Sequence, residues 1–510
     1  MQVAEMTLSN RGHRLGSLLP DLALPASIAA TPIDAVVADS RTAKPGGLFF
    51  AVPGVNHNGE QFIDAAVKGG AVAVVVEDQH FASDASITWR GDVPVIGVRD
   101  VLTSMGQAAA WFYGDPSRSL SVVGVTGTNG KSTCVSLLAQ LQQLLGIKAA
   151  VIGTLGYGLV REKPQATGMT TPDAISCQRI LRELVDQQAQ AVSMEVSSHA
   201  LVQKRIAGIH MTAGIFTNIS RDHLDYHGDM ANYIAAKAQL FCRPGLRHGI
   251  VNLDDEYGSK AMMAAVQPGA RLWTYGLRDP AADVYATRLR YLTKGTDALV
   301  RTPWGSGFLR SSLLGEFNVY NLLAVVTAVC AQGADFSTVL DLVPYLQPVK
   351  GRMQRVQADA PVHVVVDYAH TPDALRQALT ALRAHGEQNI HVVFGCGGDR
   401  DSGKRPLMAA VAEAGADSVV VTSDNPRTEP ADKIIDEICR GFVDRSKVAV
   451  IADRAEAIAN VIANARDGDV VLIAGKGHED YQIIGSNRFP FDDAAHARLA
   501  LMARTNTEAY

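Results

Sequence analysis

A glycine-rich loop between a strand-like run and a helix-like run constrains the fold of this chain more than any other feature. The loop Gly124-Val-Thr-Gly-Thr-Asn-Gly-Lys-Ser-Thr133 overlaps an apolar run at 121–125 and leads into a helix-like run at 132–145. A strand, a loop of small residues and a helix in this order form a phosphate cradle, because backbone N–H groups and the helix N-terminus face the anion. In such a cradle Lys131 would neutralise the β- and γ-phosphates, and the Ser132 hydroxyl would bind Mg²⁺. The loop therefore predicts ATP as a co-substrate.

This loop departs from the general P-loop formula at one position. The formula has a glycine five residues before Gly130, where this chain has Val125. A glycine-rich turn without a ligand is the alternative interpretation, and the order of strand, loop and helix counts against it. The loop by itself does not say what the ATP is used for.

The length of the chain exceeds what one hydrophobic core supports. Its 510 residues suggest about three domains of ordinary size. The hydrophobic fraction of 47% and the charged fraction of 19% are ordinary for a globular protein. The formal net charge is −5 and Lys and Arg form no block, so we expect no nucleic acid among the partners.

Cysteine usage and the lengths of the apolar runs indicate the compartment. The six cysteines are spread along the chain without a CxxC pair, which argues against a disulfide framework or a zinc site and fits a reducing cytosol. We see no basic region followed by a long apolar run at the N-terminus, and apolar runs such as 71–76 are far too short to span a bilayer. We therefore expect a cytoplasmic protein with no membrane insertion.

Alternating strand-like and helix-like runs predict an α/β fold in three domains. Strands at 71–76 and 93–98 and a helix at 61–68 precede turn chemistry at 114–117. Further strands are predicted at 121–125, 149–152, 191–196 and 214–218, and the pattern then breaks near 347–352. A second series is predicted at 362–367, 390–394, 418–422 and 470–474. The predicted domains are therefore 1–115, 116–350 and 351–510.

Several further motifs stand in a distinctive order. They are Met194-Glu195-Val-Ser197-Ser-His199, Asn218-Ile-Ser-Arg-Asp222-His223-Leu-Asp225-Tyr-His227-Gly228, Tyr233-Ile-Ala-Ala-Lys237, Gly315-Glu-Phe-Asn318-Val-Tyr-Asn321 and Val366-Asp367-Tyr-Ala-His370-Thr-Pro372-Asp373. Together with the phosphate loop, they make essentially the whole chain resemble the Mur ligase family. The resemblance implies an N-terminal uridine-nucleotide-binding α/β domain, a central P-loop ATPase-like domain with a parallel sheet, a C-terminal Rossmann-like α/β domain, and a monomer.

Within that family the chain resembles the ligases that add the third amino acid. The motifs that carry this resemblance are Asp39-Ser40-Arg41, Thr170-Thr171-Pro172, Gly397-Gly398-Asp399-Arg400, Asp424-Asn425-Pro426-Arg427 and Gly475-Lys-Gly-His-Glu479. They imply ATP-driven addition of meso-2,6-diaminopimelate to UDP-MurNAc-L-Ala-D-Glu through an acyl phosphate, in peptidoglycan precursor synthesis. The implied partners are these three small molecules, with Mg²⁺ as cofactor.

The resemblance also assigns the ATP, metal and catalytic residues. ATP binding is implied for Gly127, Thr128, Asn129, Gly130, Lys131, Ser132, Thr133, Asn318 and Arg352. Mg²⁺ binding is implied for Ser132, Glu195, His223 and Lys237, the last as a carbamate formed with CO₂. Lys131, Lys237 and His223 are the implied catalytic residues. The alternative for Glu195 and His223 is a structural hydrogen bond, and for Lys237 a solvated place on a helix.

A second set of residues is implied for the UDP-MurNAc-dipeptide. It comprises Ser40, Val55, Asn56, His57, Thr170, Thr171, Ser197, Gln203 and Arg205. Arg205 suits this role because a guanidinium clamps a carboxylate or phosphate. For Ser40 and the threonines, turn or cap formation is the alternative. Met169 stands where some relatives carry a polar residue, so a contact at that position is left open.

A third set is implied for diaminopimelate: Arg400, Asp424, Asn425, Pro426, Arg427, Gly475 and Glu479. Diaminopimelate resembles lysine with a second carboxylate at its far end, and arginine binds a carboxylate through two parallel hydrogen bonds. Lysine-adding relatives lack the arginine of this loop. Arg427 therefore favours diaminopimelate over lysine, with Asp424 and Glu479 available to its distal ammonium group.

Three other functions are weighed against this one. A folylpolyglutamate synthetase shares the central ATP domain and the amide chemistry, but needs neither a uridine-binding domain nor the Asp424–Arg427 loop. A Mur ligase that adds L-alanine, D-glutamate or a dipeptide is disfavoured by the late motifs. A P-loop NTPase acting as a switch would hydrolyse ATP without an amino acid.

Overall fold

The computed structural model describes residues 12–54, 58–78, 86–292, 294–356, 360–386 and 388–507, and the side chains of these residues up to 504. The chain divides into two compact units. The first unit comprises Met1–Tyr275 and Thr327–Ala331, and the second Gly276–Val326 and Gln332–Tyr510. Each unit is described by itself below.

The first unit begins with a five-stranded sheet of order β3-β4-β5-β7-β6, parallel except for the β6–β7 pair. Its strands are β3 (Ala35–Val37), β4 (Gly47–Ala51), β5 (Ala71–Glu77), β6 (Ile87–Arg90) and β7 (Val93–Val98). Its helices are α1 (Leu15–Leu18), α2 (Ala26–Ala29), α3 (Ile63–Lys68) and α4 (Val101–Phe112). Alternate residues of β4 face opposite sides: Leu48 and Phe50 lie in the core that includes α1 and α4, and Phe49 lies in the core that includes α3. Apolar side chains thus cover both faces, as the α/β prediction requires.

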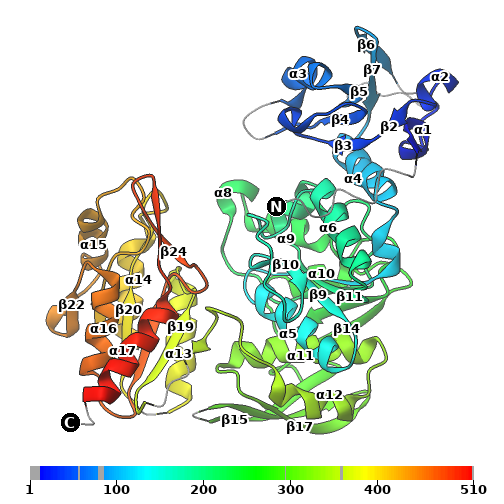
Figure 1. Ribbon diagram of the computed structural model, residues 1–510. Coiled ribbons are helices and arrows are strands. Elements are labelled where there is room, and N and C mark those ends of the chain that lie inside the picture. Colours follow the sequence, from blue (N-terminus) through cyan, green and yellow to red (C-terminus); the bar gives the residue numbers. More distant parts are fainter. Residues whose placement is uncertain are drawn as a thin grey trace. The chain divides into compact units, whose positions relative to one another are not determined.

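The same unit contains seven strands of a second sheet, in the order β10-β9-β11-β8-β12-β13-β14, and every pair among them but β9–β10 is parallel. Figure 1 labels β9, β10, β11 and β14 of this set. Its strands are β8 (Ser121–Thr126), β9 (Ala149–Gly153), β10 (Gly156–Leu159), β11 (Ala191–Glu195), β12 (Ala213–Phe216), β13 (His248–Asn252) and β14 (Arg271–Gly276). Its helices are α5 (Lys131–Leu144), α6 (Ala174–Asp186), α7 (Ser198–Val202), α8 (Leu224–His227), α9 (Met230–Ala238) and α10 (Ser259–Ala265). After β8 the chain forms β9, β10 and β11, which lie on one side of β8 in the strand order. It then forms β12, which lies on the other side of β8. Ligands bind at such a switch point, at the carboxyl ends of the strands.

The second unit contains a set of three consecutive antiparallel strands and a six-stranded sheet of order β18-β19-β23-β20-β21-β22. The first is formed by β15 (Val284–Leu292), β16 (Gly295–Thr302) and β17 (Gly305–Ser311), followed by α11 (Glu316–Ala331), which continues into the first unit, and α12 (Phe336–Leu342). The six-stranded sheet contains β18 (Gln354–Arg355), β19 (His363–Asp367), β20 (Ile390–Phe394), β21 (Ser418–Val421), β22 (Val448–Val450) and β23 (Val470–Ala474). Its remaining elements are α13 (Pro372–Ala384), α14 (Lys404–Gly415), α15 (Ala431–Cys439), α16 (Arg454–Asn464), α17 (Asp493–Thr507) and the hairpin β24 (Tyr481–Ile484)–β25 (Asn487–Pro490).

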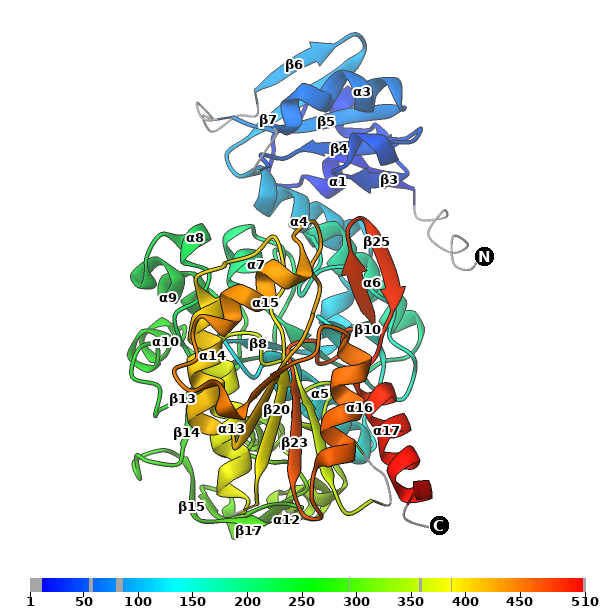
Figure 2. The same ribbon diagram turned by 90° about the vertical axis from the view of Figure 1, so that its left-hand side faces the viewer.

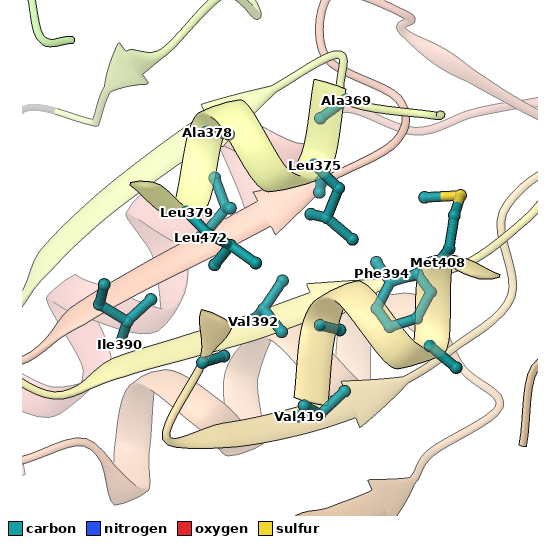
Figure 3. Packing of buried hydrophobic residues seen from close by; sticks show 14 of the residues in the cluster. Ala369, Leu375, Ala378, Leu379, Ile390, Val392, Phe394, Met408, Val419 and Leu472 are labelled. Carbon is teal, nitrogen blue, oxygen red and sulfur yellow. The ribbon is translucent and has the colours of Figure 1, made fainter. Parts of the chain in front are cut away.

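Helices cover both faces of the six-stranded sheet (Figure 2). On one face Leu375, Leu379 and Met408 pack against Val392 and Phe394 (Figure 3). On the other face residues of α16 and α17 pack against β19 and β23. All its strand pairs except β18–β19 are parallel, so the loops after β19, β20, β21 and β23 lie at one edge.

The strands predicted from the sequence are confirmed, each with ends within two residues of the prediction. The helix predicted at 132–145 is Lys131–Leu144, and the helix predicted at 61–68 begins as a 3₁₀ turn, Gly59–Phe62, before α3. The α/β fold class is confirmed, and the exact domain boundaries stay predictions. Among the helices in the described part of the chain, none has the length and apolar character needed to cross a bilayer.

Candidate active site

The predicted phosphate loop joins the carboxyl end of β8 to the first turn of α5. Gly127 has a φ of 150°, and a Cβ atom there would lie 1.9 Å from the Thr217 hydroxyl oxygen. Gly130 has a φ of 85° directly before Lys131, which opens the helix. Both positions require glycine for steric or conformational reasons. The loop therefore has the geometry of a phosphate cradle at a helix N-terminus.

Residues that follow β12 hold this loop in place. The Thr217 hydroxyl donates to the Asn129 carbonyl at 2.6 Å, and the Asn129 N–H donates to the Asn218 side-chain oxygen at 3.0 Å. The Thr128 N–H donates to the Asn218 carbonyl at 2.8 Å. Sequence reasoning gave Thr217 and Asn218 no role. Their position just after a strand of the same parallel sheet was the available signal.

Two lysines meet at the carbonyl oxygen of Gly127. The Lys131 ammonium donates to it at 2.9 Å and to the Thr128 carbonyl at 2.8 Å, and Lys237 Nζ donates to it at 2.8 Å. The Lys237 side chain is buried, and its Nζ lies 4.6 Å from the centre of the Tyr233 ring. Burial, and then the charge of Lys131, hold the pKa of Lys237 well below its usual value. The structure thus brings two of the three predicted catalytic residues together and excludes the solvated-helix alternative for Lys237.

The third predicted catalytic residue, His223, lies in a cluster of rings. The His199 ring centre lies 4.9 Å from that of His223, 4.2 Å from that of Tyr226 and 5.5 Å from that of His227. Burial lowers the pKa of His223, and it lowers that of His199 to about 4. These two imidazoles are therefore neutral near pH 7, the form in which a ring nitrogen can bind a metal. His223 has a φ of 54°, in the left-handed region, just before α8.

Glu195 is the last residue of β11 and its side chain is buried. Its carboxylate accepts hydrogen bonds from the Thr154 N–H at 2.9 Å and the Thr154 hydroxyl at 3.2 Å. A Cβ atom at Gly153 would lie 2.4 Å from the same carboxylate, so β9 must carry glycine there. Thr154 was missed by the sequence analysis. Within the described residues, no group of three or more His, Cys, Asp or Glu side chains forms a metal cage.

Most of the residues predicted for the dipeptide lie in one hydrogen-bonded network. The Thr171 hydroxyl donates to the Glu195 carbonyl at 2.9 Å, and Arg205 donates to the Thr171 carbonyl at 2.8 Å. Arg205 also donates to the Gln203 side-chain oxygen, at 2.7 and 3.0 Å. The Ser197 N–H donates to the Thr171 hydroxyl at 3.1 Å.

Thr170 is linked to this network through Thr154, whose hydroxyl donates to that of Thr170 at 3.1 Å. Met169 is part of the network as well, because its sulfur lies 3.2 Å from an Arg205 nitrogen. The network places these side chains beside Glu195, and their contact with a substrate stays a prediction.

The residues predicted for the uridine end are only partly described. Ser40 begins a 3₁₀ turn, Ser40–Thr42, after β3, and Asp39 caps this turn by accepting from the Arg41 N–H. The cap is therefore Asp39, not Ser40, which leaves the Ser40 hydroxyl outside that role. Val55, Asn56 and His57 lie outside the described residues.

In the second unit, Asn318 and Arg352 are the residues predicted for ATP. Asn318 is buried in the first turns of α11, where its amide donates to the Leu314 carbonyl at 2.8 Å. The guanidinium of Arg352 lies 4.5 Å from the centre of the Tyr368 ring, just after β19. Both contacts are within the protein, and nucleotide binding by Asn318 and Arg352 stays a prediction.

The residues predicted for diaminopimelate converge at one edge of the six-stranded sheet. Loops after β20 and β21 touch closely, since a Cβ atom at Gly398 would lie 1.9 Å from the Pro426 carbonyl oxygen. Arg427 donates to the Gly398 carbonyl at 2.8 Å. A Cβ atom at Gly397 would lie 2.9 Å from an Arg427 nitrogen and 3.8 Å from Arg400 Cγ, so both guanidinium-bearing chains border this glycine.

The loop after β23 completes this edge. Gly475 has a φ of 116°, and a Cβ atom there would lie 3.1 Å from the Asp424 carboxylate. The Asn425 amide donates to the Glu479 carboxylate at 2.8 Å. Lys476, to which the sequence analysis gave no role, is fully buried with its ammonium 3.1 Å from Asp424 and 3.7 Å from Glu479.

Three family models match this chain in succession. The Mur ligase family catalytic domain matches residues 32–113, the Mur ligase middle domain residues 125–329, and the Mur ligase glutamate ligase domain residues 351–477. A curated relative from Pseudomonas aeruginosa, named UDP-N-acetylmuramoyl-L-alanyl-D-glutamate--2,6-diaminopimelate ligase, is 48% identical over 465 residues, which are 91% of this chain and 94% of that protein. The chain belongs to the Mur ligase family.

Two solved structures extend the comparison. A structure titled as a UDP-N-acetylmuramoyl-L-alanyl-D-glutamate--2,6-diaminopimelate ligase is 37% identical with a TM-score of 0.73, covering 97% of this chain and 99% of that chain. The folylpolyglutamate synthase of Mycobacterium tuberculosis, complexed with ADP and AMPPCP, is 18% identical with a TM-score of 0.61 and covers 73% of this chain and 92% of that chain. The second likeness shows a shared fold alone.

Proposed function

We propose that this chain is an ATP-dependent ligase that joins meso-2,6-diaminopimelate to the glutamate carboxylate of UDP-MurNAc-L-Ala-D-Glu. Relatives and a solved structure that carry the name of this ligase support the reaction over more than nine-tenths of the chain. The observation that carries the choice of amino acid is the edge where Arg427 and Arg400 border Gly397, beside Asp424 and Glu479. A site with both cations and carboxylates fits an amino acid with charged groups at both ends.

The phosphate loop would serve the activation step. A carboxylate is a poor acyl donor, because its leaving group would be oxide. Transfer of the γ-phosphoryl group of ATP to the substrate carboxylate forms an acyl phosphate and ADP. The amine of diaminopimelate then attacks, and inorganic phosphate leaves as the amide forms. ATP and the substrate carboxylate are both anions and must approach each other. Lys131, at the start of α5, would neutralise part of the charge of the ATP phosphates.

A divalent cation would complete the charge balance of this step. The oxygens of Ser132 and Glu195 suit Mg²⁺, which proteins usually hold through one or two carboxylates together with phosphate oxygens and water. His223 and Lys237, as its carbamate, are the further ligands that we propose. Bound Mg²⁺ would supply positive charge to the phosphate oxygens.

The carbamate of Lys237 is supported by its surroundings. A buried amine beside a second lysine reacts with CO₂ in its neutral form and thereby exchanges an ammonium for an anion. The intact mass of the protein, measured under mild conditions, should exceed the sequence mass by one CO₂. A mass equal to the sequence mass would contradict the carbamate.

Replacing Arg427 by alanine tests the amino-acid choice. Arg427 would bind the distal carboxylate of diaminopimelate, and loss of a hydrogen-bonded charge of this kind costs about 2–3 kcal/mol. We expect kcat/KM for diaminopimelate to fall roughly 30- to 150-fold, with unchanged ATP binding by calorimetry. The control is Arg383→Ala, which breaks the 2.7 Å pair with Asp417 just before β21, at the opposite edge of the sheet, and should leave kcat/KM unchanged. Full diaminopimelate activity in the Arg427 variant would overturn the assignment.

A further inference from the structure

The edge of the six-stranded sheet holds a lysine for which the proposed reaction has no direct use. The Lys476 side chain is fully buried, and its ammonium donates to the Asp424 carboxylate at 3.1 Å and to the Asn425 side-chain oxygen at 2.9 Å. The Glu479 carboxylate lies 3.7 Å from the same nitrogen. A buried ammonium is costly unless carboxylates and hydrogen bonds compensate it, so these contacts define its position closely.

Lys476 also fixes the orientation of the Asn425 amide. The side-chain oxygen of Asn425 accepts from Lys476 and, at 3.0 Å, from the Ile483 N–H, which leaves its NH₂ group facing Glu479. Turning the amide over would place its NH₂ group against two donors. The ammonium therefore lies directly beside the Asp424 and Glu479 carboxylates. It also orients the Asn425 amide that donates to Glu479.

Charged groups of both signs surround this lysine, and the positive charge of Arg427 also acts on Glu479. Arg454 and Asp493 form a buried pair through two hydrogen bonds of 2.7 Å, and Arg454 also donates to the Ala474 carbonyl before Gly475. Asp424 and Glu479 then face Lys476, two carboxylates against one ammonium. Burial, followed by the charge of Asp424, raises the pKa of Glu479, and the Lys476 charge opposes this rise.

We propose that Lys476 is a positioning residue that holds the Asp424 and Glu479 carboxylates in place to receive an ammonium group of diaminopimelate. The proposal rests on the proposed function. Lys476 does not itself bind that ammonium, because two like charges repel each other. Its contribution passes through the two carboxylates, because the ammonium makes their close approach favourable.

Lys476→Met in the full chain tests this role. Without the ammonium, the two carboxylates repel each other and Asn425 is free to turn. The KM for diaminopimelate should rise at least 10-fold, while the KM values for ATP and for UDP-MurNAc-L-Ala-D-Glu stay within twofold. The matched control is Lys433→Met on α15, whose side chain is 61% exposed and lies 4.0 Å from Glu437, and it should change none of the three KM values.

A double variant keeps the test decisive if the single variant folds poorly. Lys476→Met combined with Asp424→Asn removes the ammonium together with one of the two carboxylates that face it, so only Glu479 loses a cation. The KM for diaminopimelate in the double variant should be less than 10-fold above that of Asp424→Asn alone, because only the contribution of Lys476 through Glu479 remains to be lost. Equal increases of all three KM values, an unchanged KM for diaminopimelate, or a double variant 10-fold or more above Asp424→Asn would each overturn the positioning role.

The activity of the wild-type chain distinguishes a failure of this proposal from a failure of the proposed function on which it rests. If the wild type makes no product with diaminopimelate, the proposed function fails and the role of Lys476 falls with it. If the wild type makes the product and the Lys476 variants behave like Lys433→Met, only the positioning role fails.

Discussion

At the residue scale, the absence of a side chain at Gly127 allows the phosphate loop to pack against the segment that follows β12. The φ of 150° and the 1.9 Å approach of a Cβ atom to the Thr217 hydroxyl leave no room for a methyl group. That hydroxyl also donates to the Asn129 carbonyl, so displacing Thr217 loosens the loop. Gly127 thus couples β12 to the cradle.

Gly127→Ala should therefore impair nucleotide binding more than folding. We expect ATP affinity, measured by calorimetry, to fall at least 10-fold, because the loop or Thr217 must move. Gly146→Ala is the control: its φ of 84° imposes backbone strain of roughly 1–2 kcal/mol, yet no atom lies within 4 Å of the added methyl group. Equal ATP affinities in the two variants would show that the contact with Thr217 is unimportant.

Reasoning from the sequence identified side chains with suitable chemistry better than it identified which residues contact one another. It selected Lys131 and Lys237, which meet at the Gly127 carbonyl. It missed Lys476, Thr154 and Thr217, whose importance depends on which loops the sheet brings together. A lysine within Gly475–Glu479 has no periodic signal that marks it as buried, and its partners lie about fifty residues away along the chain. Only the strand order places the two loops at one edge.

At the element scale, β20 connects the hydrophobic core to the diaminopimelate loops. Phe394 is its last residue, fully buried in the cluster with Leu375 and Met408, and the loop with Gly397 and Gly398 follows it directly (Figure 3). A well-packed core side chain at a strand end fixes where the next loop begins. The strands were predictable because their apolar runs are continuous, as expected for parallel strands buried on both faces.

Phe394→Ala should lower the free energy of unfolding by about 3–5 kcal/mol, since it removes a fully buried aromatic side chain and leaves a cavity. Urea denaturation measures this loss. Phe308→Ala in β17 is the matched control, because Phe308 is 60% exposed and its removal should cost less than about 1 kcal/mol. A loss at Phe394 no larger than that at Phe308 would contradict the packing described for this sheet.

At the scale of the whole molecule, the chain combines two kinds of binding edge. The first unit carries the phosphate loop with Lys131, Lys237 and Glu195, and the second carries the edge with Arg427 and Lys476. The alternation of strands and helices predicted the α/β fold, and the resemblance to the family implied the roles of the two sets of residues. An NTPase switch would need the first set of groups alone. The second set is what a ligase for a charged amino acid needs in addition, and such a ligase is the function that we claim for this chain.

Phosphate release from ATP, measured with UDP-MurNAc-L-Ala-D-Glu and either meso-diaminopimelate, L-lysine or no amino acid, tests that claim most directly. We expect release with diaminopimelate, together with a product whose mass is that of the UDP-MurNAc-tripeptide, and little release in the other two cases. Release with lysine in place of diaminopimelate would contradict the role of Arg427. Equal release without any amino acid would contradict the ligase itself.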